Sequence, residues 1–244
     1  MLIINKIYNL FIRALNYWLP ESVLVKLKHQ GFRRYFKNTS WVFFGRIITL
    51  IFSFFVGVYI ARYLGPEKYG ILNYVMSFVL IFSFIPAFGI DIILMRELVK
   101  YPDKKDQLLG TSFLIKVFGG LLAICAVTLV SFIVGNGWSV NLLVLFFSFT
   151  FIFQAFNVLD TWFASQVLSK NVVLSQIFAT ASSAILKLIF IVLNFSIFWI
   201  LLAFVFESVF LAVGLISFYK KADLSFSSWN FDKSYCISLL KVSW

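Results

Sequence analysis

Long apolar runs, separated by short polar clusters, recur along the whole 244-residue chain. A helix of roughly 20 apolar residues crosses the hydrocarbon core of a bilayer, which is about 30 Å thick. The pattern therefore predicts an all-α integral membrane protein with about six transmembrane helices. The six expected spans are Trp41–Arg62, Gly70–Leu94, Gly110–Val134, Val140–Trp162, Asn171–Asn194 and Phe198–Tyr219.

The uncharged run from Val117 to Leu159 gives the strongest evidence that the chain turns back within the membrane. The run contains 43 residues, which would extend about 65 Å as one helix, twice the thickness of the hydrocarbon core. Gly135-Asn136-Gly137 lies near its midpoint and supplies the glycines and the polar residue of a turn. Further turns are expected at the polar clusters Gly65–Gly70, Tyr101–Asp106 and Asn194–Ile197. The last of these is so short that it predicts two antiparallel neighbouring helices.

The segment before the first span has an amphipathic pattern that ends at Pro20. Such a basic helix with tryptophan on its apolar side is typical of a membrane surface, and packing on the protein's own cytoplasmic face is the alternative. The apolar positions are Ile3, Ile7, Leu10, Phe11, Ala14, Leu15 and Trp18, opposite Lys6, Asn9, Arg13 and Asn16. We therefore divide the chain into a cytoplasmic amphipathic and basic leader (1–37), a six-helix lobe (38–219) and a cytoplasmic tail (220–244).

The composition supports the membrane class, because 61% of the residues are hydrophobic and only 13% are charged, with 32 phenylalanines. A water-soluble domain of this length needs a larger polar share to cover its surface. The net charge of +11 would suggest a nucleic-acid partner in a soluble protein. Here the basic residues lie between apolar runs, so they indicate membrane topology and we expect no nucleic-acid partner.

Lysine and arginine are distributed unequally between alternate connecting segments. The leader with the start of the first span, the second loop, the fourth loop and the tail carry 8, 4, 1 and 4 of them, whereas the first, third and fifth loops carry 2, 0 and 0. Basic segments stay in the cytoplasm during insertion. The pattern predicts that both termini are cytoplasmic, which requires an even number of spans.

Six ionisable residues lie within the expected spans or at their margins, where an unpaired charge costs several kcal/mol. Lys187 and Glu207 lie at similar depths, roughly 10–14 Å below the outer surface, on the two neighbouring helices around Asn194–Ile197. A salt bridge between them is the default prediction, and a water-filled cavity in which they contact a substrate or a coupling ion is the alternative. The six residues are Arg46, Asp91, Lys116, Asp160, Lys187 and Glu207.

Arg46, Asp91 and Lys116 form a second group near the margins of their spans. We expect Arg46 and Lys116 to lie together on the cytoplasmic side, where such cations would attract a phosphate. Asp91 pairs with either cation only if the second span ends earlier than Leu94. For Arg46, snorkelling to the lipid headgroups is the alternative.

The sequence contains no phosphate-binding loop, no Cys/His metal cluster and no nucleophile elbow. Cys125 and Cys236 lie in different environments, so we predict no disulfide, no metal site and no cofactor. No segment between the spans is long enough for a catalytic domain, so we expect a transporter and no enzyme. The run of small residues Ala179–Ala184 and the pair Gly119-Gly120 indicate either close helix packing or a wet cavity wall.

The segment Tyr59–Gly70, with Arg62, Gly65, Pro66 and Gly70, resembles the first loop of bacterial polysaccharide flippases. These are the O-antigen and capsule translocases of the multidrug/oligosaccharidyl-lipid/polysaccharide exporter superfamily. The resemblance covers roughly Asn38 to Lys241 and includes Phe88–Asp91, Arg96–Leu98 and Leu159–Phe163. The chain departs from the family at Ser165–Lys170, where many members carry a Gln-Gly-x-Glu-like turn.

The resemblance implies a multi-pass protein of the bacterial cytoplasmic membrane that moves a polyprenyl-pyrophosphate-linked oligosaccharide across the bilayer. It implies two similar lobes with twelve or more spans, of which this chain contains the first. We therefore expect a truncated chain whose tail begins a seventh span and whose missing second lobe is a partner. The pyrophosphate requires cations, and the candidates are Arg46, Lys116 and Lys187, with Asp91 and Glu207 as charge partners.

Three other hypotheses remain open at this stage. In a drug or ion exporter of the same architecture, transport would depend on protonation and deprotonation of Glu207 and Asp91, and the basic residues would be dispensable. A membrane enzyme of glycan assembly, such as a polymerase, would require a large outer loop with catalytic groups. A non-transporting remnant would insert into the membrane and fail to restore transport.

Overall fold

The computed structural model describes residues 30–87 and 89–242, and within these ranges all regular structure is helical. This confirms the all-α prediction. In chain order the elements are α3 (Gln30–Ile81), α4 (Phe84–Ala87), α5 (Ile90–Lys100), η1 (Pro102–Lys104), α6 (Lys105–Val134), α7 (Trp138–Ser148), α8 (Thr150–Gln154), α9 (Asn157–Ser165), α10 (Ser169–Val192), α11 (Ile197–Lys221), η2 (Phe226–Ser228) and α12 (Lys233–Val242).

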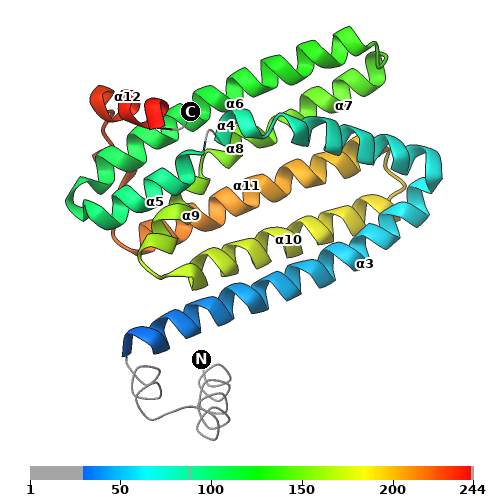
Figure 1. Ribbon diagram of the computed structural model, residues 1–244. Helices are drawn as coiled ribbons and strands as arrows, with labels where there is room; N and C mark the ends of the chain where they lie inside the picture. The colour runs from blue at the N-terminus through cyan, green and yellow to red at the C-terminus, as the bar shows by residue number, and fades with distance from the viewer. Residues whose placement is uncertain (1–29, 88, 243–244) are drawn as a thin grey trace, which may run out of the picture.

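Five helical stretches of the described chain are long and apolar enough to cross a membrane, so the protein is a multi-pass membrane protein. The first stretch has 67 residues, about three times the length of one crossing. It contains the first two predicted spans, because α3 reverses direction in its middle (Figure 1). The other four stretches are Pro102–Val134, Trp138–Ser165, Ser169–Val192 and Ile197–Lys221.

The reversal of α3 occurs at Gly65-Pro66. Gly65 has φ 69° and ψ 174°, a conformation that is accessible to glycine and costly for residues with a Cβ atom. Pro66 has no N–H group and is tolerated at the first position of the returning helix. The two arms of α3 then contribute to one hydrophobic core, with Val56, Ile60 and Leu64 from the first arm and Leu72, Val75 and Val79 from the second.

The predicted second span, Gly70–Leu94, is wrong at its end. Helix α3 stops at Ile81, the short helix α4 follows, and α5 starts at Ile90 after Gly89, which has φ 64°. Pro86 lacks an N–H group and Gly89 adopts a left-handed conformation, so the helical hydrogen-bond pattern is interrupted between Ile81 and Ile90. Asp91 therefore lies in the first turn of a separate helix, α5, which packs against α6 and α9.

The remaining turns agree with the sequence pattern. Gly135, Asn136 and Gly137 separate α6 from α7, and both glycines have positive φ. Helices α10 and α11 are antiparallel neighbours joined at Asn194, and they approach closely enough for the Ser183 hydroxyl to donate to the Ala203 carbonyl at 2.8 Å. Gly120 in α6 allows a close approach of α8, because a Cβ atom there would lie 3.0 Å from the Phe151 carbonyl oxygen.

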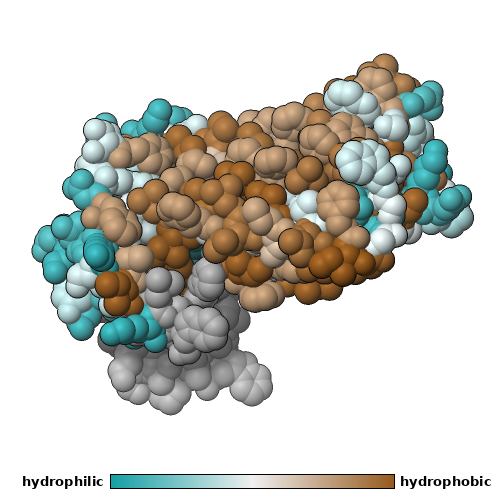
Figure 2. Space-filling view, turned by 90° about the horizontal axis from the view of Figure 1, so that it is seen from above, coloured by the Kyte–Doolittle hydropathy of each residue, from teal (hydrophilic) through white to brown (hydrophobic). Residues whose placement is uncertain are grey.

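The outer surface has the distribution expected of a membrane protein. Figure 2 shows apolar residues over the middle of one face and hydrophilic residues gathered at its two ends. The start of α3, the η1 turn, the α9–α10 connection and the end of α11 lie at one end of the molecule (Figure 1). These are the segments to which the lysine and arginine pattern assigned a cytoplasmic location, and that location stays a prediction. The expected amphipathic helix before Pro20 lies outside the described residues.

Candidate functional site: a polar cavity within the membrane-spanning helices

A cavity of about 680 Å³ lies between both arms of α3 and helices α7, α8, α10 and α11. The cavity is partly open at the surface of the molecule. About half of the residues that line it are polar or charged, and such groups are costly among membrane-spanning helices unless water or a ligand solvates them. The polar and charged residues that line it are Arg46, Thr49, Ser53, Asn73, Ser77, Thr150, Gln154, Gln176, Thr180, Lys187, Glu207 and Ser208.

Lys187 of α10 and Glu207 of α11 form an ion pair in the cavity wall, with 2.9 Å between Nζ and Oε2. The other carboxylate oxygen of Glu207 accepts a hydrogen bond of 3.1 Å from the Thr180 hydroxyl. The lysine side chain is 6% exposed and Nζ lies 3.4 Å from the centroid of the Phe204 ring, whereas the Glu207 side chain is 30% exposed. The expected pair is therefore present, and its acidic member is the more accessible one.

Arg46 reaches the same cavity from the first arm of α3. It is exposed, and no carboxylate of the described residues forms a salt bridge with it. Thr49 and Ser53 lie on the same helix face at spacings of three and seven residues and also line the cavity. The cavity thus has a guanidinium group that is free to form bidentate hydrogen bonds with an oxyanion.

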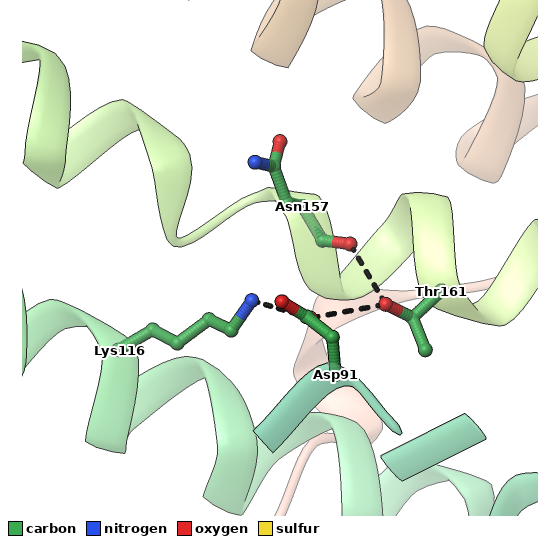
Figure 3. A network of polar contacts seen from close by, with 4 residues as sticks. All are labelled: Asp91, Lys116, Asn157 and Thr161. Atoms are coloured by element: carbon green, nitrogen blue, oxygen red, sulfur yellow. Dashed lines mark hydrogen bonds and ion pairs between the residues drawn. The ribbon is translucent and has the colours of Figure 1, made fainter. Parts of the chain in front are cut away.

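Lys116 lies outside this cavity and forms a second polar cluster with Asp91 and Thr161 (Figure 3). Its Nζ atom donates to Asp91 Oδ1, and the Thr161 hydroxyl donates to the same oxygen at 3.1 Å. The Lys116 side chain is 5% exposed and that of Asp91 is 47% exposed. The elements that supply these three residues are α6, α5 and α9.

The expected grouping of Arg46 with Lys116 is therefore wrong. Because α3 ends early, Asp91 lies in α5 and its carboxylate pairs with Lys116, which does not line the cavity. Arg46 instead shares a cavity with Lys187, which the sequence pattern had placed in a different group.

The model of the polysaccharide biosynthesis protein family matches residues 35–244. The chain belongs to this family. No curated protein and no solved structure matches the chain. Family membership places the protein in polysaccharide biosynthesis, and its helices make it a membrane component of that process.

The loop motif of this polysaccharide biosynthesis protein lies at the reversal of α3 and not in the cavity wall. Gly65 and Pro66 make the turn, while Arg62 is exposed and Gly70 has open space around its Cα atom. The turn is fixed to the α10–α11 connection by the Tyr63 hydroxyl, which donates to the Phe195 carbonyl at 2.8 Å. The motif therefore sets how the two arms of α3 lie against each other, and Arg46 belongs to the first arm.

Apart from Thr180 in the small-residue run, the uncharged polar residues of the cavity were not predicted from the sequence. Gln176, Thr180 and Lys187 lie on one face of α10, at spacings of four and seven residues. Thr180 lies within the small-residue run Ala179–Ala184, and Gln176 and Lys187 lie on either side of it. That run contributes to both expected roles, because Ser183 packs against α11 while Ala179, Thr180 and Ala184 line the cavity.

Proposed function

We propose that this chain forms the first lobe of a flippase that moves lipid-linked oligosaccharide repeat units across the bacterial cytoplasmic membrane. The observation that carries the proposal is the guanidinium group of Arg46, which lines a polar cavity between apolar helices and forms no salt bridge with any described residue. Membership of a polysaccharide biosynthesis family supports export of such a glycan.

The electrostatics of the cavity suit a pyrophosphate. Arg46 and Lys187 contribute two positive charges and Glu207 one negative charge, which leaves a net charge of +1 among these wall residues. Arg46 would bind phosphate oxygens in its planar fork. Lys187 lies 14 residues beyond Val173, which packs on Gly45, or about 21 Å farther along α10, so it would act on another part of the substrate. The amide and hydroxyl groups of Asn73, Gln154 and the other polar wall residues would accept and donate hydrogen bonds to sugar hydroxyls.

The open side of the cavity suits a two-lobe transporter. Polar groups that face hydrocarbon are costly, so another protein wall or water must cover Arg46 and its neighbours. In the scheme proposed here, a second lobe covers them, and rocking of the two lobes exposes the cavity to each side of the membrane in turn. The lipid tail of the substrate would remain in the bilayer outside the cavity.

Deletion of the coding sequence in the source cell, with re-expression of the wild-type chain as control, separates this function from its rivals. A flippase predicts loss of surface polysaccharide together with accumulation of lipid-linked repeat units on the cytoplasmic side. Unchanged surface polysaccharide with increased drug sensitivity would favour a drug exporter and overturn the proposal. Exported but unpolymerised repeat units would favour a polymerase, and a deletion without any phenotype would favour a remnant.

A further inference from the structure

The polar cavity is elongated along the helices that form it. On the first arm of α3, Arg46 and Ile60 both line the cavity and are 14 residues apart, which corresponds to about 21 Å. The position of Lys187 on α10, counted from the contact of Gly45 with Val173, gives the same separation. A pyrophosphate bound at Arg46 is much shorter than this distance, so the far end of the cavity is left for another part of a ligand.

Four residues at that far end lie at a similar depth, and we call them the distal end of the cavity. Gly57 and Asn73 are each eight residues from Gly65, at the reversal of α3, and Lys187 is eight residues before Phe195, which corresponds to about 12 Å in each case. The Tyr63 hydroxyl joins the two turns through its hydrogen bond to the Phe195 carbonyl. The fourth member is Glu207, the ion-pair partner of Lys187.

The ammonium group of Lys187 is already covered on two sides. Its Nζ atom lies 2.9 Å from Glu207 Oε2 and 3.4 Å from the centroid of the Phe204 ring, and the side chain is 6% exposed. Both neighbours stabilise the positive charge. Lys187 therefore acts at the distal end through the carboxylate that it holds.

The carboxylate of Glu207 is the accessible group of the pair. Within the described chain it accepts one hydrogen bond on each oxygen, from Thr180 on Oε1 and from Lys187 on Oε2. An ionised carboxylate has about four acceptor positions, so about two stay available. Since Lys187 balances the charge of Glu207, a further cation gains little here, whereas neutral O–H groups can donate to the available positions.

The distal end also has room for a ligand. Gly57 lines the cavity, and a Cβ atom on it would have no neighbour within 4 Å among the described residues outside its own helix backbone. Asn73 lines the cavity from the second arm of α3, and its amide nitrogen donates to the Tyr69 carbonyl at 2.9 Å. Its amide oxygen is a further acceptor for hydroxyl groups.

We propose that the distal end is a subsite for the glycan of the substrate, in which the Glu207 carboxylate accepts hydrogen bonds from sugar hydroxyls. Lys187 and Thr180 are positioning residues that hold this carboxylate. The assignment rests on the proposed function, in which the pyrophosphate of the same molecule binds at Arg46. The substrate class is then an extended oligosaccharide on a pyrophosphate, since a pyrophosphate alone contacts only one end of the cavity.

The affinity that a glycan adds to a polyprenyl pyrophosphate tests the subsite. The probe is the pool of polyprenyl-pyrophosphate-linked saccharides extracted from the source cell, mixed with bare polyprenyl pyrophosphate. Native mass spectrometry of the purified protein identifies each bound lipid by its mass. The wild type should select a glycan-bearing lipid over the bare one by about tenfold or more, as expected for hydrogen bonds to a charged group.

Two variants should remove this selection and leave the binding of bare polyprenyl pyrophosphate unchanged. Gly57→Leu fills the open space and leaves the ion pair in place. Lys187→Met with Glu207→Leu removes the carboxylate without stranding a buried ammonium group. Gly70→Leu is the matched control, because it adds the same side chain to α3 in open space outside the cavity.

Gel filtration of each variant shows whether it is folded, and Gly57→Leu tests the subsite even if the double variant fails to fold. A wild type without selection, or Gly57→Leu with the selection of the wild type, would overturn the subsite. The same spectra test the proposed function separately. If Arg46→Ala and the wild type bind bare polyprenyl pyrophosphate equally, the pyrophosphate site fails, whatever the result for the glycan.

Discussion

Lys187 Nζ and Glu207 Oε2 lie 2.9 Å apart between α10 and α11, and the glutamate is about five times as exposed as the lysine. The pair is therefore asymmetric: loss of the glutamate strands a buried ammonium group, and loss of the lysine strands a carboxylate that the Thr180 hydroxyl and the cavity still solvate. Breaking a buried pair from one side costs about 3–5 kcal/mol, which is more than removing both members.

We expect Glu207→Ala to reduce stability most, Lys187→Ala to reduce it less, and the double variant to be more stable than Glu207→Ala alone. Thermal unfolding of detergent-purified protein, followed by fluorescence-detected gel filtration, gives the order. A loss in the double variant equal to the sum of the two single losses would show that the two residues are not coupled.

The close approach of α6 and α8 at Gly120 gives a second prediction. A Cβ atom at this position would lie 3.0 Å from the backbone oxygen of Phe151, which cannot move away as a side chain could. Gly120→Ala should lower the free energy of unfolding by about 1–3 kcal/mol. Gly70→Ala is the control, because open space surrounds that position and a helical alanine gains about 0.5–1 kcal/mol over glycine. A loss of stability in the control as large as that at Gly120 would count against this explanation.

Val167, in the turn between α9 and α10, has φ 57°, a left-handed conformation that is strained for a β-branched residue. The turn is fixed to the start of α3, since Arg34 donates to the Gln166 carbonyl at 2.7 Å and Asn38 exchanges two hydrogen bonds with Ser169. Val167→Gly should relieve the strain and raise stability by about 1 kcal/mol. The same substitution at Val172, in helix α10, should lower it, and unfolding curves in denaturant would compare the two.

The ends of α6 test the membrane topology. This helix of 30 residues extends about 45 Å and separates the η1 turn from the Gly135–Gly137 turn. With Cys125 and Cys236 replaced by serine, a membrane-impermeant thiol reagent on intact cells should label Asn136→Cys and leave Pro102→Cys unlabelled. Labelling of both positions from outside would contradict the arrangement of spans.

The membrane class and the turns could be predicted from local sequence. The length of each apolar run can be compared with the thickness of the bilayer, and glycine and proline affect the backbone only at and next to their own positions. The Lys187–Glu207 pair was predictable for the same reason, since a short turn makes α10 and α11 neighbours. The partner of Lys116 was not predictable from span boundaries drawn by hydropathy, since Pro86 and Gly89 break an apolar run that continues through them.

The cavity required tertiary information. Arg46 and Lys187 line the same cavity because the first arm of α3 packs against α10, where Gly45 leaves room for the side chain of Val173. These residues are more than 120 positions apart in sequence, and no periodicity of either helix specifies that contact. Placing an uncharged polar side chain within the membrane costs too little free energy for the sequence alone to identify these cavity residues one by one.

Binding of polyprenyl pyrophosphate to the purified chain in nanodiscs is the most direct test of the account. Arg46→Ala should weaken this binding at least tenfold, because a charge-assisted bidentate contact contributes about 1.5–3 kcal/mol. Arg62→Ala removes an exposed arginine from the same helix outside the cavity and should leave the affinity unchanged. Polyprenol without phosphate should bind both variants and the wild type equally weakly. Equal affinity of Arg46→Ala and wild type for the pyrophosphate would contradict the assignment of the cavity as the substrate site.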